Sequence, residues 1–424
     1  MIDLPTLQVI GWVIVGASLL SFALTSGFDS GIGILLPFIG RNDTERRLTL
    51  NVIGPTWDGN QVWLIAAGGA VFAIWPLVYS TAFSGYYVAM LLILWSLFLR
   101  PVGFEYRSKL PNQTWRNNWD IGIFIASFIP ILIMGIAFGN LLLGSPFSYD
   151  PVFLRMQYTG SFIDLLSPFA LLSGVIAIFM VICHGAAYLN LRTKGIIKTR
   201  AQKALRLFAW CYLIAFALAG LLITYKIPGY LLGSQAGSIH DPLINHVNRH
   251  VGAWLNNYHT YPWMTLAPVI GFLGAFLAII STHANRAIWS FVGTSFIQMG
   301  TLLTAAFSLF PFIMPSSSEP AHSLTVWNAS TSQHTLTIIA IVAVIMVPVI
   351  FCYTSFVYIK MWRDGPIHEK DIEKISIFYI NLYFLYYFKI KETTEYDVYR
   401  LVFIYIGNYV SHRADCSSSR PSPP

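Results

Sequence analysis

Residues 57–63 read Trp57-Asp58-Gly59-Asn60-Gln61-Val62-Trp63, and a long apolar segment begins within them and runs from Val62 to Phe83. An apolar run of about 20 residues has the length of a membrane-spanning helix. The stretch therefore sets a carboxylate, two carboxamides and two indoles at the point where the chain meets hydrocarbon. Because polar and ionisable groups are costly there, they are candidates for function.

The composition of the whole chain is typical of a membrane protein. Of its 424 residues, 55% are hydrophobic and 11% are charged, whereas soluble domains carry roughly 25% charged residues. The mean hydropathy is +0.61, which indicates a chain that crosses the membrane several times. The formal net charge of +7 does not indicate nucleic-acid binding, because the basic residues lie in short loops between apolar runs.

Nine apolar segments are long enough to cross the membrane. Each is predicted to be an α-helix, because a spanning backbone must satisfy its own hydrogen bonds and no segment alternates like a barrel strand. The first segment is too long for a signal peptide, so we expect it to be retained. The predicted fold class is all-α polytopic membrane protein, with spans near 8–36, 60–80, 83–101, 119–143, 164–190, 205–226, 262–282, 287–311 and 335–360.

The basic residues of the loops predict the orientation. The loops after the second, fourth, sixth and eighth spans contain three basic residues in total, namely Arg155, Lys226 and Arg249. Because cytoplasmic loops carry an excess of Lys and Arg, the N-terminus is predicted outside and the end of the ninth span in the cytoplasm. The loops on the predicted cytoplasmic side contain Arg41, Arg46, Arg47, Arg107, Lys109, Arg116, Arg192, Lys194, Lys198, Arg200, Lys203, Arg206, Arg286, Lys360 and Arg363.

The segment after the ninth span has a different composition. Residues 375–388 are rich in Ile, Tyr and Phe but too short to span comfortably, and the chain ends in a Ser- and Pro-rich stretch. We therefore predict two parts, a nine-helix domain over 1–363 and an atypical cytoplasmic tail over 364–424. The tail is interpreted as disordered or non-native, and no function is assigned to it.

Two interpretations of Asp58 remain open. A carboxylate at a helix start can cap the helix, and Trp57 and Trp63 would then be interfacial anchors. Alternatively, Asp58 takes up protons from the cytoplasm, because such a site needs an ionisable and hydrated mouth. In a helix, Asp58 and Gln61 share one face, whereas Asn60 and Trp63 lie off it.

The first span carries a second acid, Asp29, within a glycine-rich stretch. Gly27, Gly31 and Gly33 allow another helix to approach closely. Arg100 ends the third span on the same predicted side, so a buried Asp29–Arg100 pair would be neutral and tolerable. Two charges further along, in Glu105-Tyr106-Arg107, are interpreted as part of a solvated loop.

The histidines and cysteines do not indicate a metal or haem site. His184 is the one histidine well inside a predicted span, and we interpret it as a hydrogen-bonded packing residue. The outer loop 227–261 has four histidines without a strong ligand spacing, and the four cysteines are scattered. We expect no metal in this chain, and no nucleotide loop or nucleophile motif is present. By itself, the chain shows no catalytic centre.

Several long motifs resemble subunit II of the cytochrome bd ubiquinol oxidase family. The resemblance covers about residues 1–363, with matching spacing and the same nine-span count, whereas the tail differs from the family's short basic tail. The matching stretches are Gly27-Phe-Asp-Ser-Gly31, Gly40-Arg-Asn-Asp-Thr-Glu-Arg-Arg47, Trp57-Asp-Gly-Asn-Gln-Val-Trp63, Phe83-Ser-Gly85, Phe98-Leu-Arg-Pro-Val-Gly-Phe104 and Phe310-Pro-Phe-Ile-Met-Pro-Ser-Ser317.

The resemblance implies a respiratory oxidase of the bacterial inner membrane. The complex would be electrogenic, oxidising quinol and reducing dioxygen to water with protons drawn from the cytoplasm. Haems b and d and the quinol-oxidising loop would belong to the partner, subunit I. This chain would be the non-haem subunit II, which supports haem assembly. A structural quinone and a small accessory subunit are left open.

The resemblance also assigns roles within this chain. It implies a proton route through Asp58, to which the sequence adds Asp29, and a dioxygen route beside Trp63. Two other classes of function remain: a proton-coupled transporter that uses Asp29 and Asp58, and a purely structural scaffold. The residues expected to support the two routes are Trp57, Asn60, Gln61 and Arg100.

Overall fold

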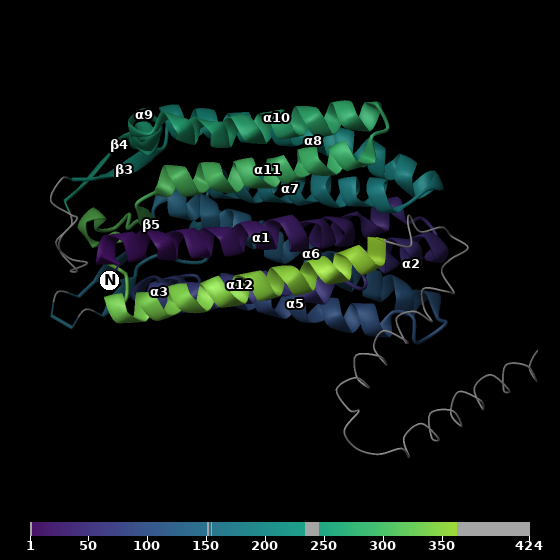
Figure 1. The fold of residues 1–424 in the computed structure, drawn as a ribbon, viewed down its shortest axis with the longest axis horizontal. Helices are drawn as coiled ribbons and strands as arrows, with labels where there is room; N and C mark the ends of the chain where they lie inside the picture. Colours follow the sequence, from purple (N-terminus) through teal and green to yellow (C-terminus); the bar gives the residue numbers. More distant parts are fainter. Residues whose placement is uncertain (1, 151, 154, 234–245, 363–424) are drawn as a thin grey trace, which may run out of the picture. The chain divides into compact units, whose positions relative to one another are not determined.

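A computed structural model describes the chain except residues 1, 151, 154, 234–245 and 363–424, so the predicted tail lies outside the described residues. Most of the described chain is α-helical (Figure 1). The α-helices are α1 Leu4–Ile39, α2 Asp43–Asn51, α3 Trp57–Ile74, α4 Pro76–Gly85, α5 Tyr87–Tyr106, α6 Gln113–Leu143, α7 Pro168–Arg192, α8 Gly195–Tyr225, α9 Asn256–Thr260, α10 Leu266–His283, α11 Ala287–Leu309 and α12 Gln333–Trp362.

Three short hairpins and four short 3-10 helices accompany the α-helices in the described chain. Each hairpin is a two-stranded antiparallel sheet, for example with Phe147 opposite Tyr158 in the first. The hairpins follow α6, α8 and α11, and so lie at the end of the bundle where those helices finish (Figure 1). The strands are β1 Phe147–Tyr149, β2 Met156–Tyr158, β3 Pro228–Leu232, β4 Val247–Val251, β5 Phe312–Met314 and β6 Leu324–Thr325.

The membrane-spanning helices agree with the hydropathy prediction. Among the described residues, eight helices are long and apolar enough to cross a membrane, or nine if α3 and α4 are counted as one bent span. The predicted spans near 119–143 and 287–311, for example, correspond to α6 and α11. Apolar runs predict such helices well because a helix in lipid must present apolar side chains along its whole length.

The predicted span 60–80 is broken, which is a correction to the prediction. α3 ends at Ile74, α4 begins at Pro76, and their axes differ by 117°. Proline lacks an N–H and has a fixed φ, so it suits the first turn of a new helix better than the middle of a long one. α3 alone has 18 residues, about 27 Å of helix, which nearly matches the ~30 Å thickness of the hydrocarbon core.

Helix α1 lies at the centre of the described helices and contacts α3, α6, α7 and α12 (Figure 1). Two of its glycines permit the closest approaches. A Cβ on Gly31 would lie 1.9 Å from the Val181 carbonyl oxygen of α7, and one on Gly33 would lie 2.0 Å from Ser127 Oγ of α6. The close helix approach predicted from these glycines is therefore confirmed.

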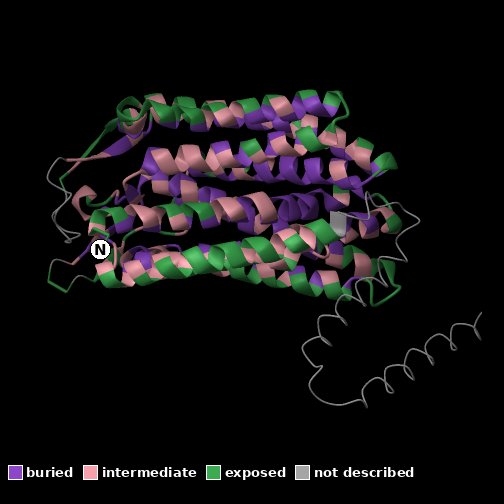
Figure 2. Cartoon of the chain, viewed as in Figure 1, coloured by how far each residue is buried: buried purple, intermediate pink, exposed green. Residues whose placement is uncertain are grey.

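Burial differs strongly between the helices. α7 is largely buried, whereas only 6% of the apolar window of α12 is buried (Figure 2). One hydrophobic cluster joins α7, α8, α10 and α11, and a second joins α1 with α3–α6 and the hairpin that follows α6. Polar side chains buried between α1, α3 and α12 interrupt this apolar packing, and they form the candidate site.

Candidate functional site

Asp58 lies in the first turn of α3 and its side chain is exposed. The residue at the N-cap position is Thr56, and no side chain caps the helix there. Among the described residues, no group forms a hydrogen bond or ion pair with the Asp58 carboxylate. Asp58 is therefore an accessible carboxylate on a face of α3 that continues through Val62 and Ile65, which are also exposed.

Two residues further along, a buried amide connects three helices. Asn60 of α3 is 1% exposed, and its Nδ2 donates to Asp29 Oδ2 of α1 at 2.7 Å and to the Thr25 carbonyl at 3.3 Å. Its Oδ1 accepts a hydrogen bond from the Tyr358 hydroxyl of α12 at 2.9 Å. Because both ends of the amide are engaged, its NH₂ group is oriented toward Asp29.

Asp29 is 2% exposed, and one of its two oxygens has no partner among the described residues. Buried carboxylate oxygens are normally hydrogen-bonded, and an exception calls for an explanation such as water or a catalytic role. Asp29 Oδ1 is therefore an open acceptor inside the membrane-spanning part of the chain.

Arg100 does not form the direct ion pair predicted with Asp29. Its Nη2 instead donates to Ser30 Oγ at 2.9 Å, and at longer distance to Ser127 Oγ and the Ala126 carbonyl. Among the described residues, no carboxylate lies within ion-pair distance of Arg100. The two buried charges still interact electrostatically through space, and hydroxyls and amides supply the hydrogen bonds that a direct pair would have made.

The remaining predicted residues divide between this cluster and its surroundings. Gln61 Nε2 donates to Ser26 Oγ at 2.6 Å, which gives α1 and α3 a second polar contact. Trp57 stacks on Phe104 of α5 with ring centroids 5.1 Å apart, away from Asp29. Trp57 therefore fixes the start of α3, whereas Gln61 supports the α1–α3 contact.

Trp63 is 3% exposed and lies on the buried face of α3, about 7.5 Å along the helix axis from Asp58. Its indole N–H has no acceptor among the described residues. The two residues therefore lie on different faces of α3, one exposed and one buried. This separation agrees with the prediction that they serve different routes, but the routes themselves stay predictions.

Comparison with known proteins identifies the family. The family profile described as cytochrome bd terminal oxidase subunit II matches residues 7–361. The chain belongs to this family. It is 49% identical over 376 residues to cytochrome bd-I ubiquinol oxidase subunit 2 of Escherichia coli K12, which covers 88% of this chain and 98% of the relative. It is 44% identical over 380 residues to probable cytochrome oxidase subunit 2 of Haemophilus influenzae, covering 89% and 100%.

The fold of this subunit II also resembles a solved structure. The structure of bd oxidase from Geobacillus thermodenitrificans matches with a TM-score of 0.62 and 17% identity, covering 84% of this chain and 98% of that chain. The apolar helices and the family membership together indicate a multi-pass protein of the bacterial inner membrane.

A network of ion pairs, which sequence reasoning missed, lies beside the start of α3 in this subunit II. Arg107 is 2% exposed and contacts Asp120 of α6 at 2.5 Å and Asp43 of α2 at 3.0 Å. Asp120 also binds Arg46 at 2.9 Å, and Asp43 binds Arg116 at 2.6 Å. The interpretation of Arg107 as a solvated loop residue is therefore wrong, because the chain folds α2 over it.

A further pair connects α2 to α8. Glu45 Oε2 accepts from Arg200 Nη1 and from the Arg41 backbone N–H, each at 2.7 Å. Burial acts to raise the pKa of Glu45, but these hydrogen bonds and the charge of Arg200 outweigh it and hold the pKa below its ordinary value. The Arg200 guanidinium also donates to the Ile39 carbonyl at the end of α1.

His184 is hydrogen-bonded through both ring nitrogens in this subunit II. Nδ1 pairs with Thr294 Oγ1 and Nε2 with the Leu24 carbonyl, both at 3.0 Å, and the ring stacks on Phe291. The ring therefore acts as a packing residue that joins α1, α7 and α11. In the part of the chain that the structure describes, no three His, Cys, Asp or Glu side chains come together as a metal site.

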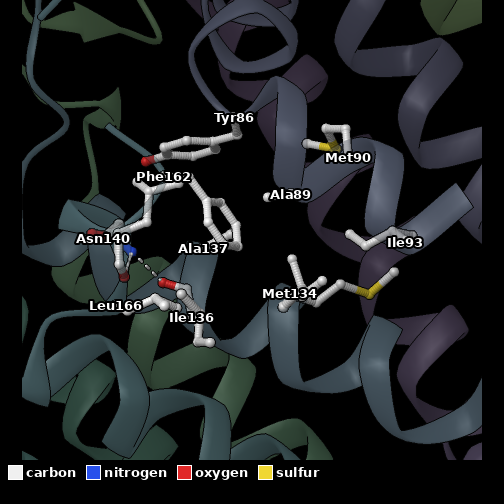
Figure 3. Close-up of a pocket in the computed structure, with 12 residues that line it drawn as sticks. Tyr86, Ala89, Met90, Ile93, Met134, Ile136, Ala137, Asn140, Phe162 and Leu166 are labelled. Carbon is white, nitrogen blue, oxygen red and sulfur yellow. Dashed lines mark hydrogen bonds between the residues drawn. The ribbon is translucent and has the colours of Figure 1, made fainter. Parts of the chain in front are cut away.

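An apolar cavity lies between α5, α6 and the segment that precedes α7 (Figure 3). Its volume is ≈ 90 Å³, well below the roughly 300–1,000 Å³ of pockets that take drug-sized ligands. Asn140 at its edge donates to the Ile136 and Leu165 carbonyls, which leaves the wall apolar. This cavity does not identify a quinone site, so the structural quinone stays a prediction without assigned residues.

Proposed function

We propose that this chain is the haem-free subunit of a respiratory quinol:dioxygen oxidoreductase. The observation that carries the proposal is the family match over residues 7–361. The relative from Escherichia coli is described as a ubiquinol oxidase subunit, which supports quinol as the electron donor. The haems would belong to the partner, subunit I, and this chain would support their assembly. The family match gives no support to the alternative, a proton-coupled transporter.

The proton route would begin at Asp58. The carboxylate is exposed at the start of α3, and the positions that follow it on the same face, Val62, Ile65 and Phe72, are 39%, 74% and 59% exposed. Such an apolar face suits contact with the partner subunit or lipid better than contact with water. When the partner subunit or lipid covers this apolar face, the Asp58 carboxylate at its edge can still take up protons from water and pass them into the protein.

Asp29 would be the second acid of the route. It lies within α1, one hydrogen bond from Asn60, and its open Oδ1 can accept a proton or a water molecule. Arg100 nearby would compensate its negative charge without blocking either oxygen through a direct pair. The Asn60 amide would hold Asp29 in one orientation during turnover.

The test of the proton route replaces Asp58 by asparagine in the complete oxidase complex. A positioned proton-transfer group typically contributes roughly 10²–10⁴-fold, so quinol-dependent oxygen consumption should fall at least about tenfold. Glu105→Gln is the matched control, because Glu105 is also exposed at the same end of the bundle. The haem absorbance spectrum should stay unchanged in both variants. Unchanged turnover in Asp58→Asn would contradict the proton route.

The dioxygen route would pass the buried indole of Trp63. Trp63→Leu changes the shape of the site and removes an indole N–H that has no acceptor among the described residues. The expected result is a change of a few-fold in apparent oxygen affinity with little change in apparent quinol affinity. Oxygen-dependent and quinol-dependent kinetics of the complex measure both, and equal changes would count against the route.

A further inference from the structure

A cationic corner at the end of the bundle that bears α2 takes no part in the proposed function. α8 packs against α10, and a tight turn joins α10 to α11 at this end (Figure 1). Lys203, His283 and Arg286 are exposed in this corner, and Arg206 is half-buried. These four side chains come from three different segments, so only the tertiary structure brings them together.

Among the described residues, no acidic side chain forms an ion pair with the basic residues of this corner. Between Leu165 and Ser318 the sequence contains one acidic residue, Asp241, which lies outside the described residues. Among the described ion pairs, α8 contributes one, Arg200 with Glu45. Lys203, Arg206 and Arg286 form none within the described chain. Within the described chain their charge is not neutralised by an ion pair, and an external anion can pair with it.

Hydrogen bonds hold the corner in place. Arg206 Nη1 donates to His283 Nδ1 at 3.3 Å, and its Nε donates to the Gln202 carbonyl at 3.3 Å. Gln202 Nε2 also donates to Asn285 Oδ1 in the α10–α11 turn at 2.9 Å. The guanidinium and the turn are thus fixed relative to each other before any ligand arrives, which lowers the entropic cost of binding.

The depth of the corner along the helices matches the lipid headgroups. α8 has 31 residues, about 46 Å, so it extends past a hydrocarbon core of ~30 Å. Trp210 and Trp289 are 51% and 52% exposed, as interfacial tryptophans are. Lys203 precedes Trp210 by about 10 Å of helix, and Leu207 between them is 60% exposed. The outer face of α8 therefore changes from apolar to cationic at the membrane surface.

We propose that α8, α10 and the start of α11 form a binding site for the phosphate of an anionic phospholipid. Lys203, Arg206 and Arg286 would contact the headgroup, while Leu207 and Trp210 would contact the acyl chains. The combination of an unneutralised cationic corner and an exposed apolar stripe directly below it favours a lipid over a free phosphate ion. Clusters of basic side chains at the ends of membrane helices are suited to anionic headgroups.

The experiment measures lipid retention by the intact oxidase complex. The triple variant Lys203→Gln, Arg206→Gln and Arg286→Gln is purified in a neutral detergent and mixed with phosphatidylglycerol or phosphatidylcholine, and bound lipid is counted by native mass spectrometry. Each basic residue near an anionic surface contributes about fivefold, so phosphatidylglycerol binding should weaken at least about tenfold. Phosphatidylcholine binding should not change.

The matched control removes three charges at the same end of the bundle but away from the corner. Arg41→Gln, Arg47→Gln and Lys109→Gln together leave the corner intact, because these side chains have no hydrogen-bond or ion-pair partner among the described residues. The control should retain phosphatidylglycerol as the wild type does. If the control loses as much lipid as the triple variant, or if the triple variant loses none, the proposal is overturned.

A competition with inorganic phosphate and a double variant complete the test. Excess inorganic phosphate should leave bound phosphatidylglycerol in place, and complete displacement by phosphate would point to a simple anion site instead. If the triple variant fails to assemble, the double variant Lys203→Gln and Arg286→Gln replaces it, because both side chains are exposed and Arg206 keeps its contact with His283. The haem spectrum reports assembly in every case.

Discussion

Two buried arginine–aspartate arrangements lie close together in this subunit, and they differ in one respect. At the end of α5, Arg107 and Asp120 contact each other directly at 2.5 Å, and further charges surround them. Within the spans, Arg100 and Asp29 do not touch, and each is hydrogen-bonded to neutral groups instead. Direct pairing uses both charges for stability, whereas separation leaves Asp29 Oδ1 free.

This difference teaches how a buried charge can be kept available. A directly paired carboxylate is held ionised by its partner and has little freedom to take up a proton. A carboxylate that is balanced at a distance keeps a free oxygen while the region stays close to neutral. We therefore interpret the Arg107 network as structural and the Asp29 cluster as functional, and variants of Arg107, Asp120 and Asp29 test this distinction.

The largest expected effect belongs to Arg107. Arg107→Leu leaves Asp120 buried with Arg46 as its remaining cation, and breaking a buried pair in this way typically costs about 3–5 kcal/mol. The apparent melting temperature of the purified complex should fall markedly, while turnover per assembled haem should change little. The double variant Arg107→Leu and Asp120→Leu should recover part of the loss, since it removes the buried carboxylate that Arg107 no longer neutralises. A double variant less stable than the single would argue against the pairing.

The second expected effect concerns Asp29, where turnover should fall and stability should change little. Asp29→Asn keeps an oxygen that can accept from Asn60 but removes the titratable group, so turnover should fall several-fold with only a small change in melting temperature. Asp120→Asn serves as the matched control, because it should lower stability and leave turnover per haem unchanged. Oxygen consumption and thermal denaturation of the same samples separate the two outcomes. Loss of stability without loss of turnover in Asp29→Asn would assign Asp29 to the structural group.

The smallest expected effect is the pH dependence of the Glu45–Arg200 pair. The pKa of Glu45 is lowered in the folded chain, so the pair stabilises the fold above the unfolded-state pKa of about 4.3. This stabilisation is lost as the pH falls through the lower folded-state pKa. Because the pair is partly exposed, we expect it to contribute less than about 1 kcal/mol.

Melting temperatures of the wild type and Glu45→Gln measure this contribution. The difference between them should be present at neutral pH and should shrink on acidification below the ordinary range of a glutamate. If the difference in melting temperature is the same at neutral and at acidic pH, the charge of Glu45 adds nothing to stability. Arg41→Gln should not reproduce the effect, because Arg41 contacts Glu45 through its backbone N–H.

The sequence by itself determined the membrane class, the all-α fold and the approximate position of nearly every span. These properties follow from local composition, because each spanning helix must be apolar along its own length. The sequence also indicated that Asp58 and Trp63 lie on different faces of α3, since helical periodicity is local. The close approach at Gly31 and Gly33 could be anticipated for the same reason.

Only the tertiary structure decided which polar groups meet. Asn60 contacts Asp29 and Tyr358, which are 31 and 298 residues away along the chain, and no local pattern contains that pairing. The same holds for Arg100, whose guanidinium contacts Ser30 instead of Asp29, and for Arg107, which α2 covers. Periodicity predicts which face of a helix is buried, but hydrogen-bond partners depend on the rotation and depth of neighbouring helices, which packing alone determines.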